Sequence, residues 1–241
     1  MIPDFLQIGD RRLAYIHRRG AGPALLFLPG YGSDMEGGKA TALDAWAAQE
    51  HRAMLRFDYG GCGASGGDFE AQGLADWLGD TLAMIDRVAE GPLILVGSSM
   101  GGWLMLLAAL ARPNRVAALV GIAPAPDFTD WGFTDAQKRT IARDGRLEEP
   151  SPYSRDPSVT TRLFWESGER LKLLGGAIGI DVPVRLLHGL EDRDVPWRIS
   201  LDLVGALRSA DARLTLVKGG DHRLSRDADI ALLIKTVADL S

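Results

Sequence analysis

Residues 92–111, with the sequence PLILVGSSMGGWLMLLAALA, decide the fold that we expect for this chain. The first run, PLILVG (92–97), is short and continuously apolar, which is typical of a strand buried on both faces. The second run, MGGWLMLLAALA (100–111), is long enough to form a buried helix. Between them stands Gly97-Ser98-Ser99-Met100-Gly101, which fits G-x-S-x-G in the strand, turn and helix setting that this pattern requires. We therefore predict a sharp turn with Ser99 at its tip.

The turn at Ser99 suits a nucleophile. It would lift the hydroxyl out at the end of the sheet and place it at a helix N-terminus, where free N–H groups favour developing negative charge. The alternative is a chance match, since the chain holds 29 glycines. A strand directly before the pattern and a helix directly after it favour the catalytic interpretation. We therefore predict Ser99 as a catalytic nucleophile, which needs a base to take its proton at neutral pH.

The chain has four histidines that could supply this base. His17 and His51 precede the predicted nucleophile, and structural roles suffice for both. His188 ends a predicted strand, where we expect a packed, hydrogen-bonded structural residue. His222 lies in GGDH (219–222), a loop between the last predicted strand and the last helix, and loops at the carboxyl ends of parallel strands carry the chemistry of such sheets. We predict that His222 is the base; the alternative is a solvated surface residue.

The loop HGLEDRDVP (188–196) offers the carboxylate that would orient this histidine. In the architecture that G-x-S-x-G indicates, the acid comes after the serine and before the histidine. We favour Asp192, because Val195-Pro196 turn the chain into the next helix and so fix the loop around it. Asp194 is the alternative acid, and its other role would be a favourable charge at a helix N-terminus. The carboxylate would hold the imidazole tautomer without taking the proton itself.

Two backbone N–H groups are needed to bind an oxyanion. One is predicted to come from Met100, directly after the nucleophile, and the other from the loop after the first long parallel strand. That strand is ALLFLP (24–29), and its loop is Pro29-Gly30-Tyr31-Gly32, so we assign the second donor to Tyr31. The alternative for this loop is a tight turn without a catalytic role.

Strands and helices alternate along the rest of the chain. Strands are expected at 5–8, 12–17, 24–29, 53–58, 92–97, 115–125, 183–189 and 213–217, and helices at 39–50, 72–89, 100–111, 197–209 and 226–240. This alternation predicts a mostly parallel sheet with helices on both faces. Between 126 and 181, aromatic residues and prolines mix with charges, and we expect a small helical cap inserted after the sixth strand. Residues 1–241 would then form a single domain.

Composition excludes several classes of protein. With 27 basic and 32 acidic side chains the formal net charge is −5, which predicts no nucleic-acid partner. The single cysteine, Cys62, excludes an internal disulfide and a Cys-rich zinc site. We expect it to be inert rather than a reactive thiol. The longest apolar stretch, 103–111, is far shorter than the roughly 20 residues of a membrane-spanning helix.

The first residues, MIPDFLQIGDRR (1–12), lack the basic segment followed by an apolar segment that marks a signal peptide. We therefore expect no signal peptide and a soluble, cytoplasmic protein. Nothing in the sequence predicts an oligomeric state.

A competing pattern, G-x-G-x-x-G, occurs at Gly61–Gly66 after a predicted strand, with Asp86 following at the distance of a ribose-binding acid. In a dinucleotide-binding site these glycines would open a helix. Here Gly67-Asp68 follow, and the next helix begins later. We therefore interpret the glycines as a rigid turn beside the active site.

Taken together, these segments resemble those of the α/β-hydrolase fold family. The resemblance rests on LPGYGSDMEGGKA (28–40), RFDYGGCGASGG (56–67), GPLILVGSSMGGWLMLLAALARP (91–113), VRLLHGLEDRDVPW (184–197) and DHRLS (221–225). It is weakest between 126 and 181. Within the family the segments are most similar to a mitochondrial branch described as palmitoyl-protein thioesterases and acyl-glucuronide esterases. The resemblance implies ester or thioester hydrolysis, with Ser99, Asp192 and His222 as the triad.

We therefore predict a serine hydrolase, using neither metal nor cofactor, that cleaves carboxylic esters or thioesters through an acyl-enzyme. The substrate would be a small molecule or an acylated protein. A serine peptidase or a C–C hydrolase on the same fold is the alternative enzyme. A noncatalytic ligand receptor is the alternative outside enzymology, and it would be expected to lack a member of the triad.

Overall fold

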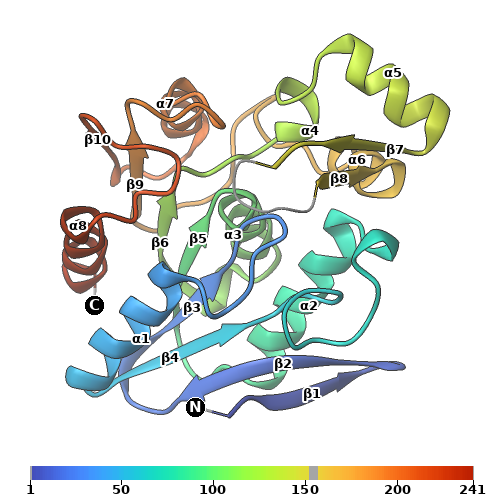
Figure 1. The fold of residues 1–241 in the computed structure, drawn as a ribbon. Coiled ribbons are helices and arrows are strands. Elements are labelled where there is room, and N and C mark those ends of the chain that lie inside the picture. Colours follow the sequence, from blue (N-terminus) through green and yellow to red (C-terminus); the bar gives the residue numbers. More distant parts are fainter. Residues whose placement is uncertain (1, 152–156, 241) are drawn as a thin grey trace.

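The structure, a computed structural model, describes residues 2–151 and 157–240. In that part of the chain a central sheet of eight strands has the order β1-β2-β4-β3-β5-β6-β9-β10 (Figure 1). Its strands are β1 (Asp4–Ile8), β2 (Arg11–Arg18), β3 (Ala21–Leu28), β4 (Arg52–Phe57), β5 (Leu93–Ser98), β6 (Val116–Ile122), β9 (Val184–Gly189) and β10 (Ala212–Val217). The helices are α1 (Gly38–Gln49), α2 (Leu74–Arg87), α3 (Met100–Ala111), α4 (Phe128–Trp131), α5 (Asp135–Asp144), α6 (Arg162–Glu169), α7 (Arg198–Ala206) and α8 (Asp227–Ala238).

The sheet is mostly parallel, as predicted. β4, β3, β5, β6, β9 and β10 are parallel neighbours. β2 pairs antiparallel with β4, and β1 pairs antiparallel with β2. Because helical connections return the chain between the parallel strands, the carboxyl ends of those strands all lie at one edge of the sheet. The loops at this edge contain Tyr31, Ser99, Asp192 and His222.

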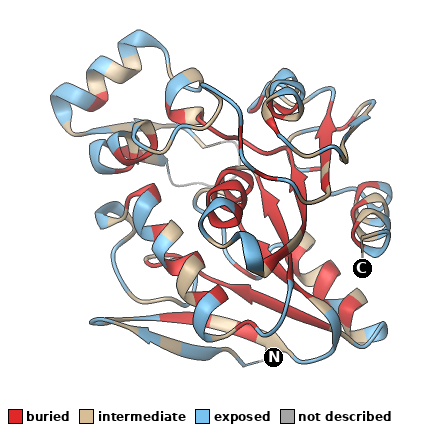
Figure 2. Ribbon diagram, turned by 180° about the vertical axis from the view of Figure 1, so that it is seen from behind, coloured by how far each residue is buried: buried red, intermediate tan, exposed pale blue. Residues whose placement is uncertain are grey.

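Helices cover both faces of the sheet, and the alternation of side chains along the strands explains why. In β5, Leu93 and Leu95 pack into one core cluster with α2 and α3, whereas Ile94 and Val96 pack into another with α1 and α8. Successive strand residues point to opposite faces, so a continuous apolar run needs a helical layer on each side. Buried residues accordingly follow the central strands and α3 (Figure 2).

The turn between β5 and α3 has the strained geometry expected of it. Ser99 has φ 54° and ψ −121°, a backbone conformation that a non-glycine residue rarely adopts. The glycines around it allow close packing of backbone on backbone: a Cβ atom at Gly97 would lie 2.3 Å from the carbonyl oxygen of Gly101. One at Gly101 would lie 2.0 Å from the carbonyl oxygen of Leu28. The sequence pattern is thus required by the packing of α3 against β3 and β5.

Gly101→Ala is expected to destabilise the protein by about 3 kcal/mol or more, because its methyl group would meet rigid backbone rather than a flexible side chain. Gly79→Ala is the matched control, since nothing lies within 4 Å of a Cβ atom at that position on α2. There the substitution is expected to stabilise the helix by about 0.5–1 kcal/mol. Denaturant unfolding of the two variants measures both effects, and equal stability for them would contradict the packing described here.

An inserted segment follows β6, as predicted. It contains α4, α5 and α6 and stands apart from the central sheet, above the carboxyl ends of its strands (Figure 1). It also contains a separate antiparallel pair of strands, β7 (Arg146–Glu149) and β8 (Ser158–Thr161), which the sequence interpretation did not include. Residues 152–156 of the predicted cap lie outside the described residues. Near its end the segment returns to the main body, where Ile178 pairs with Leu207.

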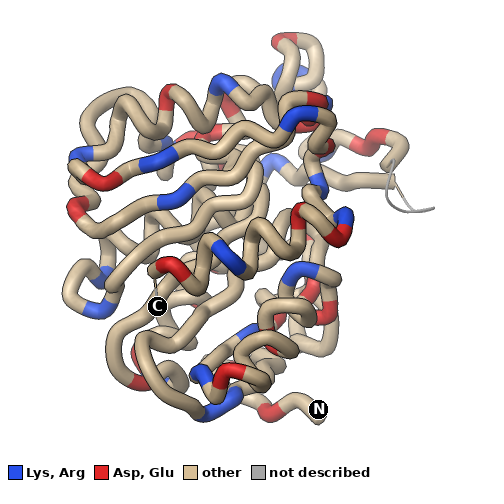
Figure 3. The backbone as a smooth tube through the Cα atoms, turned by 90° about the vertical axis from the view of Figure 1, so that its left-hand side faces the viewer, with Lys and Arg blue, Asp and Glu red and all other residues tan. Residues whose placement is uncertain are grey.

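Charged side chains are spread over the molecule. Basic and acidic residues are interspersed along the backbone in the view of Figure 3. Several form ion pairs that join separate elements, such as Arg11 with Asp80 and Arg56 with Asp44. This distribution agrees with the low net charge, and the absence of a nucleic-acid partner stays a prediction.

Candidate active site

Three predicted residues meet at the carboxyl edge of the sheet. His222 Nδ1 lies 2.8 Å from Asp192 Oδ2, and His222 Nε2 lies 3.2 Å from Ser99 Oγ. They come from three separate segments: the turn before α3, the loop after β9 and the loop after β10. Both distances allow hydrogen bonds. The structure therefore joins carboxylate, imidazole and hydroxyl in one hydrogen-bonded chain.

Asp192 is held by four donors. Its Oδ1 accepts hydrogen bonds from the backbone N–H groups of Asp194 and Val195, each at 2.9 Å. Its Oδ2 faces two imidazoles, His222 at 2.8 Å and His188 at 3.1 Å. Burial alone would raise the pKa of Asp192, but hydrogen bonds from the two histidines and the charge of His222 hold that pKa well below its ordinary value. Asp192 is thus a fixed carboxylate that stays ionised at neutral pH.

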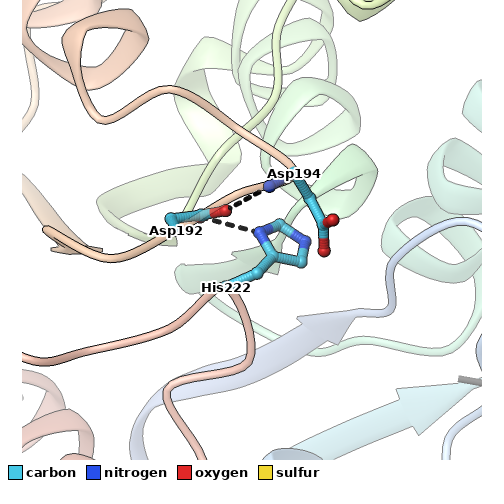
Figure 4. Close-up of side chains that lie close together, drawn as sticks. All are labelled: Asp192, Asp194 and His222. Carbon is cyan, nitrogen blue, oxygen red and sulfur yellow. Dashed lines mark hydrogen bonds and ion pairs between the residues drawn. The ribbon is translucent and has the colours of Figure 1, made fainter. Parts of the chain in front are cut away.

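The structure also places the alternative acid, Asp194. Its backbone N–H supports Asp192, while its carboxylate projects from the loop alongside the ring of His222 (Figure 4). Asp192, by contrast, meets the Nδ1 edge of that ring. Asp192 therefore has the hydrogen bond to His222 that the orienting acid requires, and its role stays a prediction.

Close packing of two loops brings Asp192 and His222 together. A Cβ atom at Gly189 would lie 2.2 Å from the carbonyl oxygen of Gly220, so the loop after β9 can lie against the loop after β10 only if this position is glycine. Lys39, at the start of α1, donates a hydrogen bond of 2.6 Å to the carbonyl oxygen of Arg223. The histidine loop is therefore fixed from both sides.

The predicted oxyanion donors lie next to Ser99. A Cβ atom at Gly30 would lie 3.4 Å from Ser99 Cβ, which places the loop after β3 directly beside Ser99. Met100 begins α3, and the N–H groups of the first helical turn have no partner within their own helix. Among the described residues, neither the Tyr31 nor the Met100 amide donates to another group of the protein. Both amides are therefore available to an oxygen atom at Ser99.

The side chain of Tyr31 has a role that sequence reasoning missed. Its ring packs against Phe69, Trp77, Phe128 and Phe164, with centroid distances between 4.7 and 6.3 Å. Its hydroxyl donates to the carbonyl oxygen of Val159 on β8 at 2.5 Å. Burial raises the pKa of the phenol, so the hydroxyl remains protonated and able to donate. Tyr31 thus connects the loop beside Ser99 to the inserted segment.

His188 is the other contact that sequence reasoning did not identify. The expectation of a packed, hydrogen-bonded residue fits its complete burial. Its contact with Asp192, however, was not anticipated. The signal available in the sequence was the spacing of four residues between His188 and Asp192 across a loop that begins with Gly189. Only the folded loop shows that this spacing brings the two side chains together.

One group of side chains has the residue types of a metal site. Ligand atoms of Asp192, Asp194 and His222 lie within 4.8 Å of one another. Each oxygen of Asp192, however, already accepts two hydrogen bonds, and His222 Nδ1 faces one of these oxygens. These atoms of Asp192 and His222 already have hydrogen-bond partners within the protein, and we assign no metal to the group.

In the glycine-rich loop after β4, backbone amides donate hydrogen bonds to carboxylates of the protein itself. The N–H of Ala64 donates to Asp58 Oδ2 and that of Gly60 to Asp80 Oδ2, both at 2.8 Å. These amides are thus turned away from an external phosphate. Asp86, which would bind a ribose in a dinucleotide site, pairs instead with Arg112 at 2.7 Å. The hydrogen bonds of the loop are those of a turn closed on itself, and its rigidity beside the active site stays a prediction.

Cys62, in the same loop, is buried. Burial raises the pKa of its thiol to about 12, and the neighbouring Asp58 and Asp80 add to the rise. A thiolate, the reactive form, is disfavoured in this setting.

The fold and the hydrogen-bonded site are typical of a hydrolase, and comparison with known proteins agrees with this class. The sequence profile described as "Serine aminopeptidase, S33", a hydrolase family, matches residues 22–146, just over half of the chain. The chain belongs to this family, within the α/β-hydrolase fold, and is a hydrolase. Its relatives include a human protein named "Palmitoyl-protein thioesterase ABHD10, mitochondrial". The two sequences are 41% identical over 232 residues, which cover 95% of this chain and 76% of the human protein.

Solved structures extend the similarity to the whole fold. Mouse alpha/beta hydrolase domain-containing protein 10 has a TM-score of 0.93 and 40% identity, covering 100% of this chain and 98% of its own. A putative hydrolase from Agrobacterium vitis S4 also has a TM-score of 0.93, at 38% identity, covering 99% of this chain and 98% of its own. These matches confirm the predicted α/β-hydrolase fold.

The expected cytoplasmic location is wrong by the same comparisons. The human, orangutan and mouse relatives are all named as mitochondrial proteins. A targeting leader is removed from the mature protein and takes no part in its fold, so the pattern of residues 1–12 gave no valid basis for a location. In residues 2–151 and 157–240 none of the helices combines the length and the apolar character needed to cross a membrane.

Proposed function

We propose that this protein is a serine hydrolase that cleaves thioesters or carboxylic esters through an acyl-enzyme on Ser99. His222 Nε2 takes the hydroxyl proton as Ser99 Oγ attacks the carbonyl carbon. The N–H groups of Tyr31 and Met100 bind the resulting oxyanion, and the imidazolium returns its proton to the leaving thiol or alcohol. Water, activated by the same histidine, then attacks the acyl-enzyme and releases the carboxylic acid.

The observation that carries this proposal is the continuous hydrogen-bonded chain from Asp192 through His222 to Ser99. A buried, ionised carboxylate on Nδ1 keeps the Nε2 lone pair directed at the hydroxyl and stabilises the imidazolium that forms. The strained backbone of Ser99, at the start of α3, places the same hydroxyl where the helix dipole favours negative charge. A noncatalytic receptor would have no need of this combination.

The substrates that we propose are acyl thioesters, including acylated proteins, with acyl glucuronides as the second class of ester. Support comes from the curated relatives named palmitoyl-protein thioesterase, at 41–43% identity. These two classes share a carboxylic acyl group and differ in the leaving group.

We also propose that residues 126–181 are a cap on a single domain. Two side-chain contacts support this assignment: Tyr31 hydroxyl to the carbonyl oxygen of Val159, and Trp103 Nε1 to the carbonyl oxygen of Leu171 at 3.2 Å. The aromatic residues that meet beneath the segment favour an apolar acyl chain. Phe164 on α6 of the cap and Trp103 on α3 are fully buried in the same core cluster, so the cap packs directly against the main body.

A peptidase remains the competing function, because the matching family profile carries the description of a serine aminopeptidase. A C–C hydrolase on the same fold is a further alternative. A peptidase would cleave aminoacyl amides and a C–C hydrolase would cleave diketones, whereas the proposed enzyme would prefer acyl-cysteine thioesters. The leaving group therefore separates these functions.

A panel of substrates tests the proposal. We expect a palmitoyl-cysteine peptide thioester, an acyl glucuronide and nitrophenyl esters of medium or long chain to be hydrolysed, with higher kcat/KM than aminoacyl anilides or a diketone. The Ser99→Ala protein is the control for every substrate. A higher kcat/KM for an aminoacyl anilide than for any ester or thioester would favour the peptidase, and an optimum at acetate would argue against a long acyl site.

A further inference from the structure

Asp192 contacts a second imidazole, that of His188, at the same carboxylate oxygen that faces His222. His188 is the residue before the last of β9, and none of its surface is exposed to solvent. Its Nε2 lies 3.1 Å from Asp192 Oδ2 and 3.0 Å from the carbonyl oxygen of Val195. Its Nδ1 lies 2.7 Å from Ser200 Oγ on α7. Both ring nitrogens therefore have partners within the protein interior.

These partners define the tautomer of His188. A carboxylate oxygen and a carbonyl oxygen only accept hydrogen bonds, so Nε2, which faces both, must carry the hydrogen. The hydroxyl of Ser200 can donate to a bare Nδ1, which satisfies the ring as a neutral imidazole. The single hydrogen on Nε2 is therefore shared between the carbonyl oxygen of Val195 and Asp192 Oδ2, which makes His188 a donor to both.

We propose that His188 is a positioning residue that acts through Asp192. This inference rests on the proposed function, in which Asp192 orients His222. Ser200 donates to His188, His188 to Asp192 Oδ2, and His222 Nδ1–H to the same oxygen, so one continuous chain runs from α7 to Ser99. Among the described residues His188 has no hydrogen bond or ion pair with Ser99, and its effect passes through the carboxylate.

The chemical reason lies in the charge of Asp192. As His222 becomes an imidazolium, the buried carboxylate must remain ionised and aligned with Nδ1. The Oδ1 atom is held by two backbone amides, and His188 is the further donor that holds Oδ2. Without that donor Oδ2 would contact His222 alone, and the alignment of this oxygen would depend on the group that must change its charge. A fixed supporting shell of this kind maintains catalytic geometry.

Two substitutions at His188 separate positioning from packing. His188→Leu keeps an apolar side chain of similar size but removes the donor, and we expect kcat to fall about 10- to 100-fold with KM unchanged, the usual loss when a partner behind a functional ligand is removed. His188→Gln places an amide N–H at the same number of bonds from Cβ as Nε2, and we expect it to recover most of the lost kcat. Equal losses in the two variants would overturn the proposal.

Stability is the matched control, because removing a buried polar group can also loosen the fold. Thr81→Val removes a buried hydroxyl on α2 whose hydrogen bond, to the carbonyl oxygen of Trp77 at 2.9 Å, lies within α2 and involves none of Ser99, Asp192 and His222. We expect Thr81→Val to lower the melting temperature without changing kcat. A fall in kcat for Thr81→Val as large as that for His188→Leu would mean that loosened packing explains the loss, and the proposal would fail.

A double-mutant cycle with Asp192→Asn shows whether His188 acts through Asp192. We expect His188→Leu/Asp192→Asn to lose no more activity than Asp192→Asn alone. Additive losses would overturn the role of His188. Full activity in Asp192→Asn would overturn the proposed triad itself, whereas an inactive Asp192→Asn beside a fully active His188→Leu would remove only the inference about His188.

Nuclear magnetic resonance of the wild-type protein gives a readout of the His188 tautomer that does not depend on activity. In protein labelled with ¹⁵N-histidine, the four rings are resolved and His188 is assigned by the signal lost in His188→Gln. We expect a protonated Nε2 and a bare Nδ1 for His188 at neutral pH. A hydrogen on Nδ1 with a bare Nε2 would exclude donation to Asp192 and overturn the proposal.

Discussion

Ser99→Ala is expected to lower kcat by about 10⁶-fold, since removal of the nucleophile of a catalytic triad costs about as much as removal of the whole triad. Without Oγ no acyl-enzyme can form. The oxyanion donors and the substrate site remain, so a residual rate of about 10³- to 10⁴-fold over water is expected. The loss should appear in kcat with both thioester and ester substrates, because the two share the acyl-enzyme.

The neighbouring serine supplies a matched control. Ser98 ends β5, is almost fully buried, and has an ordinary strand environment, so Ser98→Ala is expected to keep activity close to that of the wild type. Melting temperatures for both variants establish that each is folded. A fluorophosphonate probe should label the wild type and Ser98→Ala but not Ser99→Ala. Ordinary activity in Ser99→Ala, or a wild type that does not react with the probe, would refute Ser99 as the nucleophile.

The inner strands of the sheet could be predicted because ALLFLP (24–29), PLILVG (92–97) and PVRLLHG (183–189) are short apolar runs that end at glycine or proline. The helices could be predicted where apolar residues recur at helical spacing. The site residues could be predicted for a related reason. Ser99, Asp192 and His222 each follow a predicted strand directly, and the carboxyl ends of parallel strands share one edge. Local pattern and topology together therefore placed three distant segments at one position.

Other features depend on tertiary packing and left weaker signals. β7 and β8 are four residues each and pair only with each other, so neither carries the apolar run of a core strand. The contact between Tyr31 and β8 joins segments far apart in the sequence, so the spacing of apolar residues within either segment does not predict it. The bond from His188 to Asp192 depends on the path of the loop after Gly189, which the sequence marks only as a turn.

Asp192→Asn is expected to lower kcat about 10⁴-fold, the cost of holding the catalytic imidazole in the wrong tautomer. The surroundings of this residue force that outcome. The amides of Asp194 and Val195 both donate to Oδ1, so the asparagine oxygen must occupy that position and its NH₂ must point at His222. An N–H directed at Nδ1 requires the hydrogen of His222 to move to Nε2, which can then no longer accept the proton of Ser99.

Asp194→Asn separates the two candidate acids. The variant keeps the backbone N–H that supports Asp192, and it removes only an exposed carboxylate beside the His222 ring. We expect kcat to fall by at most about fivefold, since exposed charges contribute little. Steady-state kinetics of the two variants with one thioester substrate decide between them, because the substitutions are chemically identical and stand two residues apart. A large loss in Asp194→Asn with an active Asp192→Asn would transfer the role of the acid to Asp194, and the hydrogen bond from His222 to Asp192 would then be structural.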